Sequence, residues 1–280
     1  ILIRSGVACS KHQFAINVSD GASRIVHLAR QAYEGGDVIA RIDITNAFNV
    51  AQRARIRCLL RGKDPDVIRY FHTMYEPSSQ LAVFGPHGHV EFVESSEGVR
   101  QGDAFSSYFF CVLMDDICAQ LCRSQPNVNV MSFMDDLTLA LRPDIANDAV
   151  SNALHLIREA GFEPNISKSR CVCQDTFHSS FLPVASPDRQ FEMLGANLTA
   201  NYDEFNAAQI AKIDAFMRVL HRCDIHPQIT WTLLRLCGFP RLIYYASTTP
   251  SQHSRDVLRY FDAALERQAT TLINAPIAPA

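Results

Sequence analysis

The chain has 280 residues, a formal net charge of −3, a pI near 6.4 and 48% apolar residues. A chain of this length can bury a substantial core. The sequence contains no run of about 18 apolar residues, the length that would predict a membrane span. The slight excess of acid is not the charge of a free-standing nucleic-acid-binding domain, because phosphate neutralisation supplies much of the affinity for nucleic acids.

The N-terminal residues and the cysteines indicate an intracellular globular protein. Residues 1–4 have none of the features of a signal peptide. The nine cysteines are scattered along the chain. The pair Cys118 and Cys122 and the pair Cys171 and Cys173 each lack the partner pair of a zinc site. We therefore expect reduced thiols that mostly pack in the interior.

The first predicted elements are an amphipathic helix over residues 22–34, ended by Gly35 and Gly36, and a strand that leads to Asp43. Side chains alternate between the two faces of a strand. One face carries Val38, Ala40, Ile42 and Ile44, and the other carries Ile39, Arg41 and Asp43. Asp43 is therefore not expected in the apolar layer.

Two helices, near residues 50–60 and 65–74, and a hairpin of residues 81–84 with 90–93 are predicted next. Arg53, Arg57 and Arg61 recur every four residues and would line one face of the first helix. That face could contact nucleic acid or simply be solvated, and the sequence leaves both readings open.

A glycine-containing loop then leads into a predicted helix. Gly98 and Gly102 allow a turn and a close approach of the backbone. From about Ala104 to Arg123, apolar residues recur at helical spacing.

Two neighbouring aspartates, Asp135 and Asp136, lie between two apolar segments that predict a hairpin. Adjacent carboxylates repel each other, and a divalent cation would relieve that repulsion. Magnesium binds one or two carboxylates together with substrate phosphates, so a third acid is expected nearby, and Asp43 is the best candidate. Ordinary turn chemistry is the alternative explanation of the pair.

The rest of the chain is predicted to be mainly helical. Asp144 is a plausible N-cap for a helix that reaches Ala160 and is closed by Gly161. Further helices are expected from about Asn206, over residues 228–237 and over residues 251–273, and residues 275–280 are expected to fray.

Several of these segments, in this order, resemble the motifs of reverse transcriptases from non-LTR retrotransposons. The segment from Asp43 to Phe48 resembles the first palm motif, the segment from Arg100 to Ser107 the second, and the segment from Phe133 to Asp136 the third. Further similarities extend over nearly the whole chain. Residues 12–21 resemble the end of the fingers, and residues 161–169 resemble a fourth motif with its lysine. Residues 193–195 resemble the primer grip, and residues 227–228 and 233–242 resemble the thumb.

The resemblance implies an α+β fold, a right-hand polymerase palm on an antiparallel sheet with partial fingers and a helical thumb. The expected divisions are fingers at 1–36, palm at 37–185, a primer-grip hairpin at 186–203 and thumb at 204–280.

The resemblance also implies roles for individual residues. Asp43, Asp135 and Asp136 would hold two Mg²⁺ ions, with Mn²⁺ possible, and Asp136 is the least firm of these ligands. The backbone at Ile44 and Thr45 would lie beside the triphosphate. Phe48 would exclude a 2′-hydroxyl by its bulk, although a core aromatic is the alternative. The remaining roles are nucleotide contact by Gln101, close backbone approach at Gly102, and protonation of the leaving pyrophosphate by Lys168, which could instead be a solvated charge.

The implied reaction is addition of deoxynucleoside triphosphates to a DNA primer on an RNA template, by a domain flanked by others in a longer polyprotein. A nuclear location without membrane association follows from this reading. Three departures from the family pattern are Ala104 in place of the usual proline, Phe133 in place of the commoner tyrosine, and residues 1–20, in which only Arg4 and Lys11 are available in place of the family's basic fingers segment.

Two other functions stay open on the sequence. One is a degenerate polymerase fold that serves as a nucleic-acid-binding scaffold, which the acidic pI favours. The other is a two-metal phosphohydrolase that uses the same acids.

Overall fold

The computed structural model describes residues 9, 11–222 and 225–273. The chain forms two compact units, one that ends at Ala185 and one that begins at Ser186, and each is described by itself. Arg4 and the expected frayed end, residues 275–280, lie outside the described residues. The finer division into fingers, palm, primer-grip hairpin and thumb stays a prediction.

The first unit is built on a five-stranded sheet with the strand order β5-β6-β1-β8-β9. Neighbouring strands are antiparallel, except that β8 and β9 are parallel. The combination of helices with a mainly antiparallel sheet confirms the expected α+β class. The strands are β1 (Val38–Ile42), β5 (Asn129–Phe133), β6 (Asp136–Leu141), β8 (Arg170–Val172) and β9 (Val184–Ala185).

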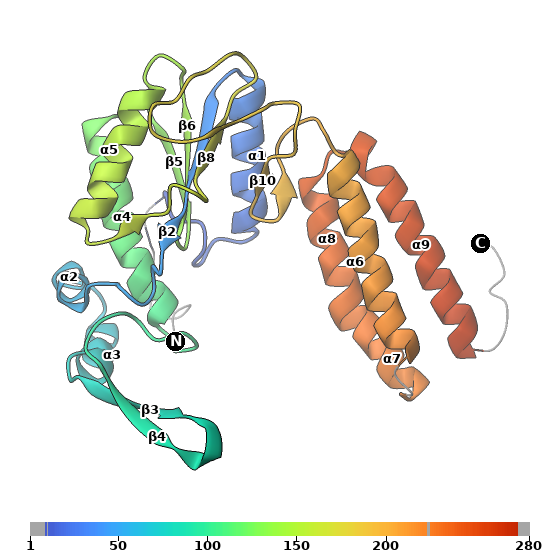
Figure 1. Ribbon diagram of the computed structural model, residues 1–280, viewed down its shortest axis with the longest axis horizontal. Coiled ribbons are helices and arrows are strands. Elements are labelled where there is room, and N and C mark those ends of the chain that lie inside the picture. Colours follow the sequence, from blue (N-terminus) through green and yellow to red (C-terminus); the bar gives the residue numbers. More distant parts are fainter. Residues whose placement is uncertain (1–8, 10, 223–224, 274–280) are drawn as a thin grey trace. The chain divides into compact units, whose positions relative to one another are not determined.

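Helices cover both faces of this sheet. Figure 1 shows α4 (Ser106–Ser124) and α5 (Ala146–Glu159) on one side of the strands and α1 (Gly21–Glu34) on the other. Val38, Ala40 and Ile42 of β1 belong to the core cluster shared with α4 and α5. Asp43 follows β1 and is half-buried, so the predicted alternation, which kept this acid out of the apolar layer, is confirmed.

The helix α5 begins later than expected. Its first residue is Ala146 and its N-cap position is held by Ile145, so the predicted N-cap at Asp144 is wrong. Asp144 lies two residues before the first residue of α5, and its carboxylate pairs with Arg142 instead of capping the helix.

The arginines that follow β2 (Ile44–Thr45) do not form a common face. In α2 (Arg53–Leu59), Arg53 is buried and Arg57 pairs with Glu76 at 3.5 Å. Arg61 lies beyond the end of α2. The predicted arginine face is therefore wrong, because the first arginine of the series points into the protein.

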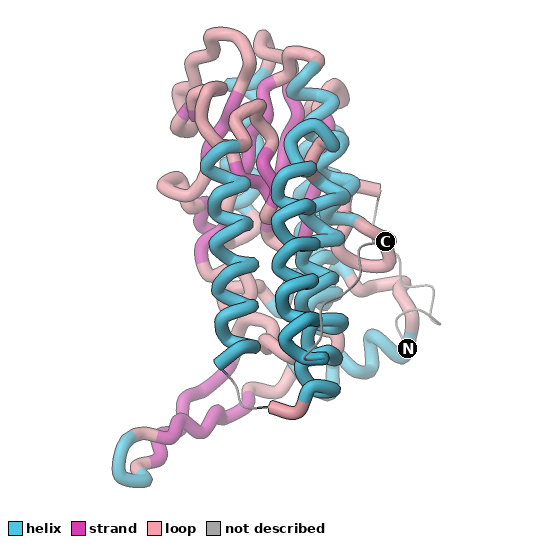
Figure 2. Tube along the Cα trace, turned by 90° about the vertical axis from the view of Figure 1, so that its right-hand side faces the viewer, coloured by secondary structure: helices cyan, strands magenta, loops and turns pink. Residues whose placement is uncertain are grey.

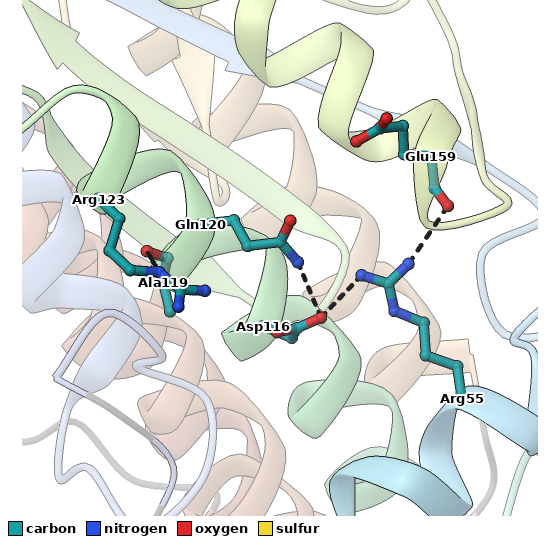
Figure 3. A network of polar contacts seen from close by, with 6 residues as sticks. All are labelled: Arg55, Asp116, Ala119, Gln120, Arg123 and Glu159. Atoms are coloured by element: carbon teal, nitrogen blue, oxygen red, sulfur yellow. Dashed lines mark hydrogen bonds and ion pairs between the residues drawn. The ribbon is translucent and has the colours of Figure 1, made fainter.

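A different arginine joins α2 to α4 and α5. Arg55 Nη2 donates to Asp116 Oδ2 at 2.7 Å, and Nη1 donates to the backbone carbonyl of Glu159 at 3.3 Å (Figure 3). Gln120 Nε2 donates to the same oxygen of Asp116 at 3.0 Å. The network fixes α2 against the helical layer of the sheet.

The predicted hairpin is present as β3 (Ser79–Phe84) and β4 (Val90–Ser95), after α3 (Pro65–Tyr75). Within the described residues these two strands pair only with each other. In Figure 1 and in Figure 2 the hairpin projects away from the other elements of the first unit. Its large apolar side chains are exposed: Leu81, Val83, Phe84, Val90, Phe92 and Val93.

The second unit is mainly helical, as expected. A short hairpin of β10 and β11 precedes α6, and α6 and α9 run alongside each other (Figure 2). Tyr202, Phe205, Tyr245 and Val257 form its core cluster. The segment predicted at 228–237 continues through a π-helical turn into α8. The elements are β10 (Glu192–Met193), β11 (Ala196–Asn197), α6 (Asp203–Arg222), α7 (Pro227–Leu233), the π-helical turn (Leu234–Gly238), α8 (Phe239–Thr248) and α9 (Ser251–Ile273).

The cysteines within the described part of the chain are free thiols, and Cys111, Cys118, Cys171 and Cys173 are buried. Burial raises the pKa of the Cys171 thiol to about 11, so this group stays protonated at neutral pH. The expectation of packing cysteines is confirmed there. None of the helices in the described ranges is long and apolar enough for a bilayer span.

Candidate active site

Asp135 lies in the tight turn of the hairpin β5–β6. Phe133 pairs with Asp136, so Met134 and Asp135 are the two turn residues. The predicted hairpin is present, but the expectation that both aspartates lie in its turn is wrong for Asp136, which is the first residue of β6. Met134 has a φ of 56°, in the left-handed region that glycine usually occupies at this position. The turn therefore needs support from its surroundings.

That support comes from the segment before α1. Ser132 donates from its backbone N–H to the carbonyl of His12 at 2.8 Å. Gln13 Nε2 donates to Ser132 Oγ at 3.2 Å, and Gln13 Oε1 accepts from the Met134 N–H at 3.3 Å. Both Gln13 and Ser132 are almost fully buried. The sequence offered no signal for this brace, because neither residue type is diagnostic in isolation.

The pairing of β1 with β6 brings Asp43 to the same end of the sheet. Ile42, the last residue of β1, lies opposite Leu137, so Asp43 follows β1 at the end of the sheet where Asp136 begins β6. The backbone of Asp43 is held on both sides: its N–H donates to Ser169 Oγ at 3.0 Å, and its carbonyl accepts from the Asn165 N–H at 2.8 Å.

The three carboxylates influence one another electrostatically. The pKa of Asp135 is raised, first by burial and then by the negative charges of Asp136 and Asp43, while Arg41 acts in the opposite direction. Arg41 Nε donates to Asp136 Oδ1 at 3.2 Å in a partly exposed ion pair. Asp136 is therefore partly neutralised by a protein cation, whereas Asp43 and Asp135 face repulsion that a metal ion would remove.

Within the part of the chain that the structure describes, no group of three or more His, Cys, Asp or Glu side chains is arranged to hold a metal ion. The register and the pKa shift bring the three aspartates into one neighbourhood, but the side chains do not converge into a preformed cage. A pair of carboxylates still fits magnesium, which takes much of its coordination from water and substrate phosphates.

Phe48 is half-buried and stacks on Phe110 of α4, with ring centroids 4.7 Å apart. It therefore packs against the core cluster and also keeps an exposed edge. Of the two residues expected beside a triphosphate, Ile44 is buried and Thr45 is exposed. Both lie in β2, which pairs with β7 (Glu163–Pro164).

The loop that carries Gln101 and Gly102 is bonded to the segment around Phe48. Val99 N–H donates to the Phe48 carbonyl at 2.8 Å, and Gly98 N–H donates to the Ala51 carbonyl at 3.0 Å. Gln101 and Gly102 are exposed, and Gly102 has a φ of 88°. The structure thus brings the first and second motifs together.

Lys168 is exposed in a turn where its backbone N–H donates to the Asn165 carbonyl at 3.1 Å. The neighbouring Ser169 and Asn165 bond to the backbone of Asp43. The turn is therefore fastened to the end of β1, while the role of the Lys168 ammonium stays a prediction.

In the second unit, Leu194 and Gly195 form the turn between β10 and β11, with φ values of 49° and 77°. The hydroxyl of Tyr244 in α8 donates to the Leu194 carbonyl at 2.5 Å. The segment that resembles a primer grip is thus a tight turn braced by a helix of its own unit.

Comparisons with known proteins agree with this arrangement. The chain is 20% identical over 252 residues to the retrotransposable element SLACS 132 kDa protein of Trypanosoma brucei gambiense, a match that covers 85% of this chain and 20% of that protein. It is 23% identical over 230 residues to a Pol polyprotein from the type-1 retrotransposable element R2 of Popillia japonica, with 74% of this chain and 38% of that protein covered. The chain therefore spans between a fifth and two fifths of the length of these relatives.

Solved structures show the same fold at low identity. Telomerase from Candida albicans, in a complex with a fragment of telomeric RNA, matches with a TM-score of 0.53 and 13% identity, over 95% of this chain and 45% of that one. Apo telomerase from Candida tropicalis matches with a TM-score of 0.55 and 12% identity, over 95% of this chain and 48% of that one. The expected right-hand polymerase fold is confirmed.

The family described as reverse transcriptase (RNA-dependent DNA polymerase) matches residues 4–198, which is more than half of the chain. The expected relation to non-LTR retrotransposon proteins is confirmed by the relatives named above. The chain belongs to the reverse transcriptase family.

Proposed function

We propose that the chain adds deoxynucleotides to a primer 3′-hydroxyl along an RNA template, in a reaction that depends on divalent metal ions. The observation that carries the proposal is the pairing of β1 with β6, which brings Asp43 to the end of the sheet where Asp136 and the Asp135 turn lie, near enough for the charges of Asp43 and Asp136 to act on Asp135. A degenerate scaffold has no use for carboxylates placed so that Asp43 and Asp136 raise the pKa of Asp135.

Enzymes of this family generally use divalent metal ions. Asp43 and Asp135 are the residues that would hold two Mg²⁺ or Mn²⁺ ions here, with Asp136 assisting because Arg41 already occupies one of its oxygens. When bound, the metals supply a lower pKa for the attacking hydroxyl and charge neutralisation for the pyrophosphate. Arg41 would hold the Asp136 carboxylate in a fixed orientation through this ion pair.

The other predicted residues would position the nucleotide. Phosphoryl transfer depends mostly on positioning and charge stabilisation, so a fixed nucleotide pocket contributes directly to rate. Gln101 and Gly102 would contact the nascent base pair, and the backbone at Ile44 and Thr45 would lie beside the triphosphate. Lys168, carried by the turn that bonds to Asp43, would give a proton to the leaving group.

The partners in this proposal are an RNA template, a DNA primer and deoxynucleoside triphosphates. The net charge of −3 indicates that this chain supplies only part of the electrostatic attraction to nucleic acid. Since the relatives are much longer than this chain, we propose that flanking domains of a longer polyprotein supply the rest.

A primer-extension assay with Mg²⁺ tests the proposal. We expect Asp135→Asn to reduce extension roughly a thousandfold or more, because the substitution removes a negative charge that would hold the metal ions. Asp144→Asn is the matched control, since Asp144 lies in an exposed ion pair with Arg142. Extension by Asp135→Asn at the rate of the control would refute the assignment, and nucleotide-independent nuclease activity would favour a phosphohydrolase instead.

The choice of sugar tests Phe48 separately. We expect Phe48→Ala to lower the preference for deoxynucleotides over ribonucleotides by on the order of tenfold, because space opens beside the 2′ position. The ratio is measured within one protein preparation, so partial misfolding does not affect it. Phe181→Ala, at an exposed phenylalanine, is the control. An unchanged ratio would show that Phe48 is only a core aromatic.

A further inference from the structure

Arg53 is a buried cation whose hydrogen-bonding capacity is fully used. The first residue of α2, it is 8% exposed. Its Nε donates to the Gly98 carbonyl at 2.8 Å, Nη1 to the carbonyls of Tyr75 and Ser95 at 3.3 and 2.9 Å, and Nη2 to the Glu97 carbonyl at 2.9 Å and Ser95 Oγ at 3.0 Å. A guanidinium has five N–H donors, and each one meets an oxygen here.

The acceptor oxygens belong to three different segments of the chain. Tyr75 ends α3, Ser95 ends β4, and Glu97 and Gly98 open the loop to Gln101. All these acceptors are uncharged oxygens of carbonyls or of a hydroxyl. They fix the position of the guanidinium relative to the three segments, and none of them neutralises its charge. Burial, and then the neighbouring Arg100, lowers the pKa of Arg53.

Arg100, two residues after Gly98, attaches the same loop a second time. The Arg100 N–H donates to the Tyr75 hydroxyl at 3.2 Å, and Arg100 Nη2 donates to Ser79 Oγ at 2.8 Å. The guanidinium groups of Arg53 and Arg100 each lie 5.4 Å from the centre of the Tyr75 ring. Tyr75 therefore connects the arginine of α2 to the residue that precedes Gln101.

A third attachment follows Gly102. Asp103 accepts from the Tyr70 hydroxyl at 2.8 Å and from the Phe105 N–H at 2.7 Å, where α4 is about to begin. The loop is thus fixed before and after a short exposed stretch that consists of Gln101 and Gly102. Fixed flanks and an exposed tip are the arrangement expected of a preorganised binding loop.

We infer that Arg53 is a positioning residue that holds the loop at residues 98–103 in the shape needed to bind the incoming nucleotide. The inference rests on the proposed function, since the loop is assigned to nucleotide contact there. Arg53 itself does not touch the nucleotide. It acts through the backbone of Glu97 and Gly98, three to four residues before Gln101.

The experiment compares Arg53→Met with Arg69→Met, an exposed arginine of α3 paired only to Asp66 among the described residues. For Arg53→Met we expect the KM for deoxynucleotides to rise about tenfold with kcat within about twofold, because the loop no longer presents a fixed surface. The affinity for the primer–template should stay unchanged. A lower melting temperature with an unchanged nucleotide KM would overturn the inference, since Arg53 would then be an anchor of the fold alone.

Amide hydrogen exchange provides a readout that needs no catalysis. In Arg53→Met we expect faster exchange across residues 98–103, whereas faster exchange confined to the hairpin at residues 79–95 would overturn the inference. If the wild-type chain extends no primer, the proposed function fails, while the exchange pattern still decides whether Arg53 fixes the loop.

Gly98→Ala keeps Arg53 and changes the shape of the loop directly. This variant therefore tests the inference if Arg53→Met does not fold. Gly98 has a φ of 74°, and an added Cβ would lie 2.4 Å from the Asn49 carbonyl oxygen. We expect the same rise in nucleotide KM in this variant. Gly62→Ala, at another glycine with positive φ and open space around it, controls for backbone strain alone. Equal nucleotide KM values for Gly98→Ala and Gly62→Ala would count against a role of the loop shape in nucleotide binding.

Discussion

The two longer hairpins of the first unit both consist of strands rich in apolar residues, but one is buried and the other is exposed. The β5–β6 hairpin lies inside a five-stranded sheet, and Leu137, Leu139 and Leu141 are fully buried. The β3–β4 hairpin pairs only with itself in the described residues, and Phe84 and Phe92 are 78% and 64% exposed. Apolar strand residues therefore predict a strand but not the layer that covers it.

The difference follows from neighbours that the local sequence does not specify. β6 lies between β5 and β1, with helices over the sheet, so its side chains are enclosed from both faces (Figure 1). The β3–β4 hairpin is fastened mainly at its base, where Arg53 bonds to Ser95 and Arg100 bonds to Ser79. The enclosed hairpin can present carboxylates at a defined position, while the other leaves its large apolar side chains exposed.

The largest difference in stability between the two hairpins is expected from Leu139→Ala in β6. The substitution should lower the free energy of unfolding by about 2–5 kcal/mol, because it removes buried methyl groups and leaves a cavity in the sheet layer. Chemical denaturation followed by circular dichroism measures the change. A loss below that of an exposed substitution would show that β6 is less enclosed than the structure indicates.

Metal binding should stabilise the acidic hairpin specifically. At free Mn²⁺ ten times its Kd, the wild-type chain should gain about 1.4 kcal/mol in stability, because the ion binds the folded state only. Asp43→Asn and Asp135→Asn should lose this gain, and Asp144→Asn should keep it. Thermal melts with and without Mn²⁺ provide the measurement, and equal shifts in all four proteins would contradict a site at these acids.

Without metal, the charge at Asp135 should be slightly destabilising. Its pKa is raised in the folded state, so between the unfolded-state and folded-state pKa values the native chain binds more protons than the unfolded chain. The stability of the wild type relative to Asp135→Asn should therefore fall as pH rises through and above about 3.9, the ordinary aspartate pKa. Denaturation in EDTA across this pH range tests the sign, and a rising difference would mean that other groups stabilise the charge.

The smallest effect is expected from Phe92→Ala in the exposed hairpin. The change in the free energy of unfolding should stay within about 0.5 kcal/mol, since the ring loses little burial. The same denaturation assay as for Leu139→Ala allows direct comparison. A loss comparable to that of Leu139→Ala would show that the β3–β4 hairpin is covered in solution.

Local patterns predicted much of the fold and part of the site. Alternation placed Asp43 outside the apolar layer, and the break between two apolar segments placed Asp135 in a hairpin turn. Helical spacing located α4, α6 and α9 closely, because periodicity and turn residues are properties of a short segment. The roles of Gln101, Lys168 and Phe48 stay predictions, and the Phe48→Ala variant tests the last of them.

By itself, the sequence determined the elements and the chemistry each could carry. Only the tertiary structure decided that Asp43 lies at the end of the sheet where Asp136 begins β6, that Arg41 pairs with Asp136, and that Arg53 is buried rather than part of a basic face. The physical reason is that strand pairing and burial depend on contacts between residues far apart in the chain, which no local periodicity encodes.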